Sequence, residues 1–297
     1  MTLVMALRRN LARVAALFLL LGANVPAFAA DNASITRGAY LAIAADCGAY
    51  HTDKMAGGAP LAGGPALKTA FGTFYGPNIT PDKQTGIGNW TEDQFKRALR
   101  SGIDEHGAYM FPVFPFTSFT NLTDADASDL YAYLMNVPAV THRAPQNDVK
   151  FPFGWRPLLF GWRTLFFKEG PLAPVEGQSA EWNRGRYLAE AVVHCQECHT
   201  PRNFLGALDK SHAYAGNPNG PDGQDAPDIT SDKKDGIGDW KLEELIELLK
   251  TGNTPDGDVV GKGMGDVVDG TGKLTDADLH AIAIYIKSLP ALPQTHK

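Results

Sequence analysis

Apolar residues recur at helical spacing in three stretches of the chain, and each stretch has a counterpart roughly 150 residues later. Gly- and Pro-rich loops separate the stretches. The pattern therefore predicts an all-α protein with few helices and long irregular connections. The helical faces, in pairs of counterparts, are Tyr40, Leu41 and Ala44 with Tyr187, Leu188 and Ala191; Phe95 and Leu99 with Leu242, Leu245, Ile246 and Leu249; and Leu130, Tyr133 and Leu134 with Ile282, Tyr285 and Ile286.

Polar residues mark where several of these helices begin. Thr91 and Gln94 have the spacing of a capping box, in which each side chain bonds the other residue's backbone N–H. Thr123 and Thr275 can each cap the last helix of a copy. The caps support the predicted helices independently of the apolar pattern.

An internal repeat explains the pairing. Residues 78–90 (NITPDKQTGIGNW) recur at 228–240 (DITSDKKDGIGDW), with eight of thirteen positions identical at an offset of 150. Three matches in the same order indicate a duplicated domain. The two flanking matches are 37–41 with 184–188 and 122–126 with 274–278.

The repeat predicts how the chain divides. We expect a signal peptide at 1–29, a first domain at 33–142, an aromatic linker at 143–178 and a second domain at 179–293. A domain of roughly 110 residues with so little regular structure has a modest core. A large buried apolar cofactor would help to complete it.

The first thirty residues have the features of an export signal. Arg8, Arg9 and Arg13 precede the apolar run Val14–Leu21, and Ala27–Ala29 forms a small-x-small cleavage site. The alternative is a retained membrane anchor, but the run is shorter than the ~20 residues that span a bilayer. We expect cleavage after this site and a periplasmic protein.

The net charge of the chain argues against one class of partner and does not choose among the others. Removing residues 1–30 takes away three arginines and no acidic residue, which leaves 24 basic against 33 acidic residues and a formal charge of −9. Nucleic acid is therefore an unlikely partner. An acidic surface suits docking on a basic redox partner, and simple solubility explains the charge equally well.

Residues 195–199, which read CQECH, carry the most specific chemistry in the chain. CxxCH is the attachment motif of a c-type haem. The thiols of Cys195 and Cys198 can each add to a haem vinyl group, and His199 is then held against the iron. A zinc site lacks a second Cys/His pair that would complete four ligands.

The first copy departs from this motif. Residues 47–51 read CGAYH, so that Tyr50 stands where the second cysteine is expected, while Cys47 and His51 are kept. Three outcomes stay open: a single thioether at Cys47, a haem without a covalent bond, or an empty pocket filled by Tyr50. We predict one certain haem c and a second that depends on this site.

With these motifs the chain resembles the class I cytochrome c family over nearly all of its mature length. The resemblance implies two tandem cytochrome c domains, in each of which the first and last helices cross at a glycine and an aromatic residue. More narrowly, residues 183–188 and 198–203 resemble two-haem cytochromes that accept electrons for proteobacterial alcohol, aldehyde or sugar-acid dehydrogenases. The crossing residues would be Gly38 and Tyr40 with Tyr133, and Gly185 and Tyr187 with Tyr285.

The resemblance also implies a methionine as the sixth iron ligand, because a thioether favours ferrous iron. In the second copy Met264, 65 residues after His199, fits this role. In the first copy, counting from the motif selects Met110, 59 residues after His51, whereas counting from the shared glycine selects Phe114, which cannot bind iron. Both alignments stay open, with His106 and Tyr109 as nearby substitutes for Met110 and Met55 as a candidate too close to the proximal side.

The linker is unusually aromatic over residues 151–167. It could touch a membrane or a partner subunit. The alternative, which we favour, is a clamp packed across both domains. We expect membrane association only through a partner.

These features predict an electron carrier rather than a stand-alone enzyme. Its donor would be a dehydrogenase subunit, and its acceptor a cytochrome or oxidase of the respiratory chain. The alternative is a two-haem enzyme whose first haem has an open coordination position for peroxide or a small substrate. A third alternative is a first domain that is a structural module without haem.

Overall fold

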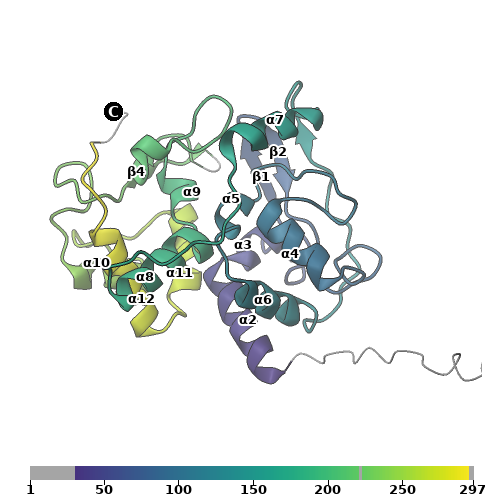
Figure 1. The fold of residues 1–297 in the computed structure, drawn as a ribbon, viewed down its shortest axis with the longest axis horizontal. Coiled ribbons are helices and arrows are strands. Elements are labelled where there is room, and N and C mark those ends of the chain that lie inside the picture. Colours follow the sequence, from purple (N-terminus) through teal and green to yellow (C-terminus); the bar gives the residue numbers. More distant parts are fainter. Residues whose placement is uncertain (1–30, 221–222, 294–297) are drawn as a thin grey trace, which may run out of the picture. The chain divides into compact units, whose positions relative to one another are not determined.

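The computed structural model describes residues 31–220 and 223–293, so the predicted signal peptide at 1–29 lies outside the described part. The described residues from Asn32 onward form one unit (Figure 1). No helix within the described ranges is long and apolar enough to cross a membrane. We call residues 33–142 the first repeat and residues 179–293 the second repeat.

Helices form the framework of both repeats, as the apolar pattern predicts. The first repeat contains α2 (Asn32–Ala44), α3 (Cys47–His51), α4 (Glu92–Ser101), α5 (Phe116–Phe119) and α6 (Asp124–Leu134). The linker contains α7 (Pro157–Phe166). The second repeat contains α8 (Ala180–Tyr187), which continues as a π-helical turn, η1 (Leu188–Val192), then α9 (Gln196–His199), the 3₁₀ turn η2 (Lys210–His212), α10 (Leu242–Thr251), α11 (Lys262–Thr271) and α12 (Asp276–Lys287).

The predicted caps are confirmed. The hydroxyl of Thr91 accepts from the Gln94 backbone, and the Gln94 side chain accepts from the Thr91 backbone. The hydroxyls of Thr123 and Thr275 each accept a backbone N–H at the start of α6 and α12. These side chains pair donors that a helix N-terminus otherwise leaves exposed.

Two small sheets depart from the all-α expectation. One has the order β1-β2-β3, with antiparallel pairing of Ala66 with Tyr75 and of Gly72 with Val149. Their strands have two to four residues, too short for a clear alternation of apolar and polar positions. The strands are β1 (Ala66–Thr69), β2 (Gly72–Tyr75) and β3 (Asp148–Val149), and in the second sheet β4 (Ala215–Asn217) and β5 (Ala226–Asp228).

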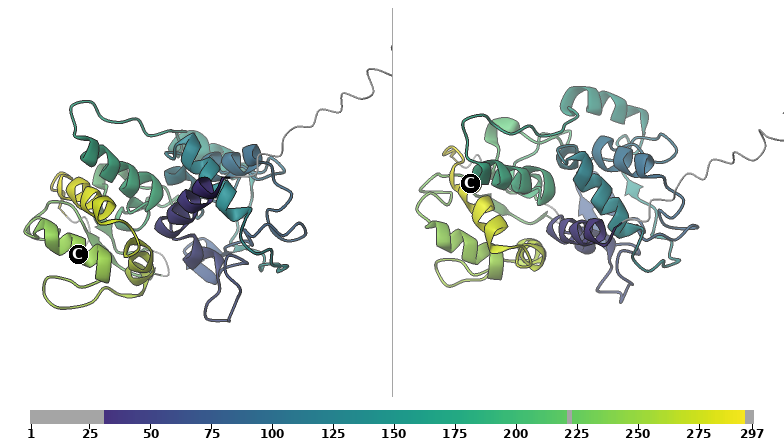
Figure 2. Two further views of the ribbon diagram at one scale, coloured as in Figure 1. Left: turned by 90° about the horizontal axis from the view of Figure 1, so that it is seen from below. Right: turned by 60° about the horizontal axis from the view of Figure 1, so that its bottom comes forward.

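The first and last helices of each repeat pack together, α2 on α6 and α8 on α12 (Figures 1 and 2). A Cβ at Gly38 would lie 1.9 Å from the Asp129 carbonyl oxygen, and one at Gly185 would lie 1.8 Å from that of Ala281. Only glycine allows so close a crossing. The predicted contact of each glycine with an aromatic residue is confirmed, since the Cβ atoms of Tyr133 and Tyr285 lie beside these positions.

Tyr40 and Tyr187 instead reach across to the opposite repeat. The Tyr40 hydroxyl donates to Asp278 of the second repeat at 2.6 Å. The Tyr187 hydroxyl donates to Asp126 of the first repeat. The repeats therefore exchange equivalent hydrogen bonds across their boundary.

The aromatic linker packs on both repeats. The indole of Trp162 donates to the Leu205 carbonyl of the second repeat at 3.0 Å. Arg163 stacks on Phe116 of the first repeat, with its guanidinium carbon 5.3 Å from the ring centre. These contacts agree with the clamp hypothesis, although Phe160 and Leu165 remain 62% and 72% exposed.

Candidate functional site

Both cysteine motifs lie on short helices that follow a sharp turn. Helix α3 carries Cys47 and His51, and α9 carries His199. The residue before each motif, Asp46 or His194, has a φ of 52° or 48°, in the left-handed region that is uncommon outside glycine. The two motifs therefore share one backbone geometry despite their different side chains.

Each motif histidine is held in one orientation by a proline carbonyl. The Nδ1 of His51 lies 2.7 Å from the Pro77 oxygen, and that of His199 lies 2.7 Å from the Pro227 oxygen. Since a carbonyl only accepts, Nδ1 carries the hydrogen and Nε2 keeps its lone pair. Burial lowers the pKa of both rings, which keeps them neutral. Each Nε2 is thus prepared to bind a metal.

The thiols have the chemistry of haem attachment rather than of a metal thiolate. Cys47, Cys195 and Cys198 are free cysteines. Burial raises the pKa of Cys195 to about 12 and of Cys198 to about 11. No group of three or more His, Cys, Asp or Glu residues within the described ranges could hold a bare metal ion. One neutral imidazole beside two uncharged thiols fits a haem.

Buried polar atoms near His199 also fit a cofactor. The side-chain amide nitrogen of Asn217 and Oδ2 of Asp228 are buried without a hydrogen-bond partner. They lie on the paired strands β4 and β5, next to the Pro227 carbonyl that holds His199. Unpaired buried atoms cost stability. A haem propionate would accept from the Asn217 amide, and a proton shared with Asp228, whose pKa burial raises, would let that carboxyl pair as well.

One backbone hydrogen bond is matched between the segments in which the two copies were searched for a sixth ligand. The Met110 N–H donates to the Gly102 carbonyl at 2.9 Å, and the Val260 N–H donates to the Gly252 carbonyl at 2.9 Å. Met110 therefore corresponds to Val260. Phe114 follows this shared bond by the same four residues as Met264, but Met264 lies partly buried on α11, whereas Phe114 precedes α5.

The substitutes considered for Met110 lie elsewhere. The His106 side chain is 83% exposed. The Tyr109 ring is covered by Arg163, whose guanidinium carbon lies 4.9 Å from the ring centre. Met55 is 98% exposed. Their positions favour surface or packing roles, and Met110 itself stays a prediction.

Glu197, inside the second motif, is a residue that the sequence pattern marks only as a spacer. Its carboxylate accepts from the hydroxyls of Thr117 at 2.8 Å and Ser118 at 2.7 Å, both on α5 of the first repeat. Arg202 donates to it at 2.5 Å. Burial raises the pKa of Glu197, but Arg202 and Ser118 outweigh burial and lower it. This network ties the second motif to the first repeat.

The residue before each motif also lies at the repeat boundary. The His194 ring packs edge-on against Phe119 of the first repeat, with 5.4 Å between ring centres. Asp46 lies near Asp266 of α11, and burial together with Asp266 raises its pKa to about 7. Each motif turn thus lies close to the other repeat, His194 to α5 and Asp46 to α11.

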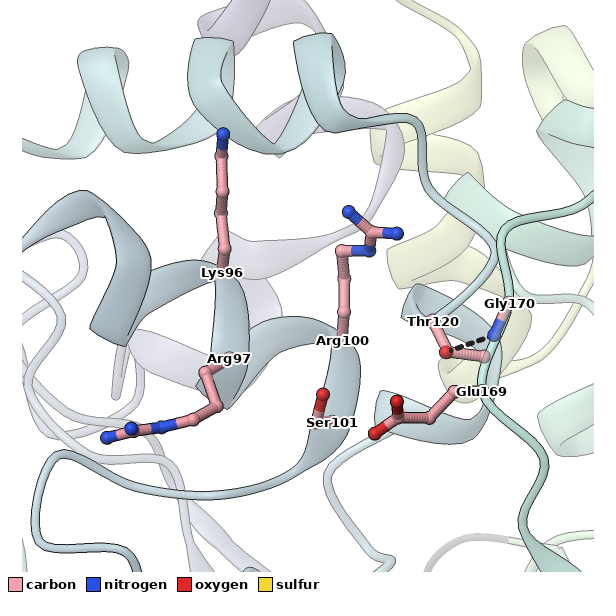
Figure 3. A pocket seen from close by; sticks show the side chains of 7 residues that line it. All are labelled: Lys96, Arg97, Arg100, Ser101, Thr120, Glu169 and Gly170. Atoms are coloured by element: carbon pink, nitrogen blue, oxygen red, sulfur yellow. Dashed lines mark hydrogen bonds between the residues drawn. The ribbon is translucent and has the colours of Figure 1, made fainter.

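One surface pocket, of about 210 Å³, lies away from both motifs (Figure 3). Lys96 and Arg100 of α4 line it opposite Glu169. Both cations pair with Asp124, at 2.8 and 3.2 Å. Lys96 also pairs with Glu92 at 2.9 Å, so these two cations meet two carboxylates, and we assign the pocket no role in cofactor binding.

Comparison with known proteins identifies the family. A Cytochrome c family model matches residues 35–138. A nicotinate dehydrogenase component of Pseudomonas putida is 43% identical over 263 residues, and the fructose dehydrogenase cytochrome subunit of Gluconobacter japonicus is 42% identical over 282. These matches cover 88% and 92% of the chain but only 22% and 57% of the relatives' lengths.

A third relative matches over most of its length. The diheme cytochrome c-type protein of Cereibacter sphaeroides is 40% identical over 276 residues, which cover 89% of each chain. The word diheme in the name of this relative is consistent with two motifs in the present chain, each with a free thiol and a histidine whose Nε2 is available to bind a metal. The chain belongs to the c-type cytochromes, and its cofactor is haem c.

Proposed function

We propose that the chain is an exported electron-transfer cytochrome with two tandem cytochrome c domains, residues 33–142 and 179–293, each holding a haem. The observation that carries this proposal is the matched pair of histidines, His51 and His199, each fixed by a proline carbonyl 2.7 Å away. Haem supplies one-electron chemistry, and the chain supplies its ligands and shielding.

The residues have distinct roles in this proposal. In the second domain Cys195 and Cys198 attach the haem, and His199 and Met264 bind its iron. In the first domain Cys47 forms a single thioether and His51 binds the iron. Fixing each ring at Nδ1 would keep Nε2 oriented to bind the iron.

The contacts between the repeats support transfer from one haem to the other. The turn at His194 packs on Phe119, and Glu197 binds Thr117 and Ser118. The second motif is therefore in direct contact with the first repeat. A packed boundary gives electrons a route through protein rather than through water.

The partners are proposed from the names of the relatives. Two are components of nicotinate and fructose dehydrogenases, and another is a gluconate 2-dehydrogenase cytochrome c subunit. We propose a dehydrogenase as donor and a respiratory cytochrome or oxidase as acceptor, in the periplasm. Cleavage of the predicted signal peptide would give a mature chain that begins at Ala30.

One observation favours the alternative of a two-haem enzyme. Phe114 follows the matched hydrogen bond by the same four residues as Met264, which supports a first haem without that ligand. Against an enzyme, the neighbouring hydroxyls of Thr117 and Ser118 are already bound to Glu197. Peroxide chemistry needs groups that transfer protons. Electron transfer remains the better supported function.

A redox titration of the mature protein, followed by its haem absorption, tests the proposal. We expect two reversible one-electron steps and rapid reoxidation by a soluble cytochrome c. Steady consumption of hydrogen peroxide, with reduced cytochrome c as electron donor, would instead support the enzyme. A single one-electron step would contradict the two-haem arrangement.

A further inference from the structure

We propose that the first haem has one protein ligand, His51, and that its other axial position binds a neutral diatomic molecule of the CO or NO class. The inference rests on the proposed function, because it requires haem in the first repeat. It adds a ligand-binding site to an electron-transfer chain.

The missing sixth ligand follows from the matched hydrogen bonds of the two repeats. Gly102 accepts from Met110 as Gly252 accepts from Val260, each at 2.9 Å. Phe114 follows its bond by four residues, as Met264 does, so we take Phe114 as the counterpart of Met264. A phenyl ring has no lone pair to offer iron. It packs instead on Phe119, with 5.6 Å between ring centres.

The other potential ligands among the described residues of the first repeat are engaged or turned elsewhere. Met135 packs against the core at the end of α6. His142 lies against Gly63, whose N–H donates to the His51 carbonyl. Met55 and His106 lie on the surface, and Tyr109 packs under Arg163. None of these five residues is a substitute for Met264 in the first repeat, and Met110, four residues before Phe114, is included in the test below.

The chemistry of the surrounding segment selects the ligand class. Residues 111–119 read FPVFPFTSF, and their only side-chain donors are Thr117 and Ser118. Both hydroxyls already donate to Glu197. Phe111 packs edge-on against Phe74, with 5.5 Å between ring centres. Hydrogen-bond donors and polarity around a haem decide which ligands it stabilises.

An apolar site without free donors disfavours peroxide and anions such as azide, because their charge or polar groups would be buried unpaired. CO and NO bind ferrous iron without needing a hydrogen-bond donor. The second haem provides an internal contrast, because Met264 would occupy its axial position and resist displacement. The two haems should therefore differ in ligand binding although they share one chain.

The test is CO titration of the dithionite-reduced protein, with total haem measured on the same sample by pyridine haemochrome. We expect one CO for every two haems. Phe114→Met should abolish this uptake and add the weak absorption band of thioether-bound ferric haem. Phe114→Leu, which keeps an apolar side chain, should retain uptake, and so should Met110→Leu. Azide at the same concentrations should leave the ferric spectrum unchanged.

The outcomes separate the inference from the function on which it rests. Two haems without CO uptake would overturn the inference and leave the proposed function intact, and a gain of uptake in Met110→Leu would then identify Met110 as the ligand. Uptake that persists in Phe114→Met would place CO elsewhere and also overturn it. One haem per chain would overturn both the inference and the two-haem function. Tight azide binding would refute the apolar ligand class.

Discussion

The two haem motifs share a backbone and differ in the side chains that fasten and complete the site. Both lie on a short helix after a left-handed residue, and both hold histidine Nδ1 on a proline carbonyl at 2.7 Å. The second motif then adds what the first lacks. The differing pairs are Tyr50 and Cys198, Ala49 and Glu197, and Phe114 and Met264.

The comparison indicates that a repeat can keep the orientation of its motif histidine while other side chains proposed to attach and ligate a haem differ. Orientation of the histidine depends on backbone geometry, which local side-chain changes barely affect. Attachment and sixth ligation depend on single side chains. Each can therefore be changed without rebuilding the fold.

The largest expected effect comes from giving the second motif the first motif's defect. Cys198→Tyr removes a thiol, so the second haem should keep only the bond to Cys195, and the haemochrome band should shift accordingly. Mass spectrometry of the denatured chain measures what remains attached. The reverse change, Tyr50→Cys, should add a thioether in the first repeat.

Cys198→Ser is the matched control, because it removes the thiol with little change of volume. It should lose the same thioether as Cys198→Tyr. If neither variant alters haem attachment, Cys198 does not bind the haem covalently. The difference between Cys198 and Tyr50 would then not affect how the two motifs attach haem.

Glu197→Ala makes the second motif resemble the first at a position that joins the repeats. It leaves Arg202 without its carboxylate partner, with only two backbone carbonyls to accept from it, and the hydroxyls of Thr117 and Ser118 without their acceptor. Removing one member of a buried ion pair costs about 3 kcal/mol. We expect that loss in denaturant-induced unfolding.

Glu176→Ala provides the control for Glu197→Ala, because Glu176 is exposed. Changes at such surface positions stay within about 0.5 kcal/mol. An equally small change for Glu197→Ala would show that the buried network does not hold the second motif against the first repeat.

Alanine substitutions at the two glycine crossings test whether the first and last helices pack equally closely in both repeats. Gly185→Ala should cost about 2 kcal/mol or more, because its Cβ would lie 1.8 Å from the Ala281 oxygen. Gly38→Ala should cost a similar amount, since its Cβ meets the Asp129 oxygen at 1.9 Å. Thermal unfolding measures both.

Gly161→Ala in α7 is the control for the crossings, because nothing lies within 4 Å of its added Cβ. Alanine favours a helix by about 1 kcal/mol over glycine, so this variant should be slightly more stable. Strongly unequal losses of stability in Gly38→Ala and Gly185→Ala would contradict an equally close helix crossing in the two repeats.

The smallest expected effect concerns how stability depends on pH. Asp46 of the first repeat and His194 of the second should contribute with opposite signs. Burial raises the pKa of Asp46 to about 7, so the folded chain holds a proton that the unfolded chain releases near pH 4. Stability from this residue therefore falls as pH rises from about 4 to about 7. Burial lowers the pKa of His194, so its contribution is lost as pH falls.

Melting temperatures of Asp46→Asn and wild type, compared at about pH 5 and pH 8, check this prediction. The variant should gain most at pH 8, where wild-type Asp46 must be charged. Asp148→Asn, at an exposed carboxylate, is the control and should follow the wild type. A gain for Asp46→Asn that is equal at both pH values would contradict the sign.

Local patterns predicted local structure well. The capping pair Thr91 and Gln94 and the crossing glycines were correctly predicted, because caps and close helix contacts depend on a few nearby or repeated residues. The short strands were missed, since two to four residues carry no periodicity. Sheet formation there depends on tertiary contact.

The rest of the site depends on contacts between distant segments. Glu197 meets Thr117 only after the repeats pack, 80 positions apart in sequence. The hydrogen bonds that Tyr40 and Tyr187 donate to the opposite repeat likewise could not be predicted from neighbouring residues in the sequence. For the sixth ligand, two counts along the chain disagreed, and the matched backbone hydrogen bonds favour the count that pairs Phe114 with Met264.

The most direct test of the central claim is the haem content of the mature chain, made with haem-maturation machinery. Intact mass under denaturing conditions and pyridine haemochrome on the same sample give attached and total haem. The account predicts two haems per chain, both retained after denaturation, with Cys47 alone fastening the first. One haem per chain would contradict it, because the shared histidine geometry would then not be sufficient to hold a cofactor in the first repeat.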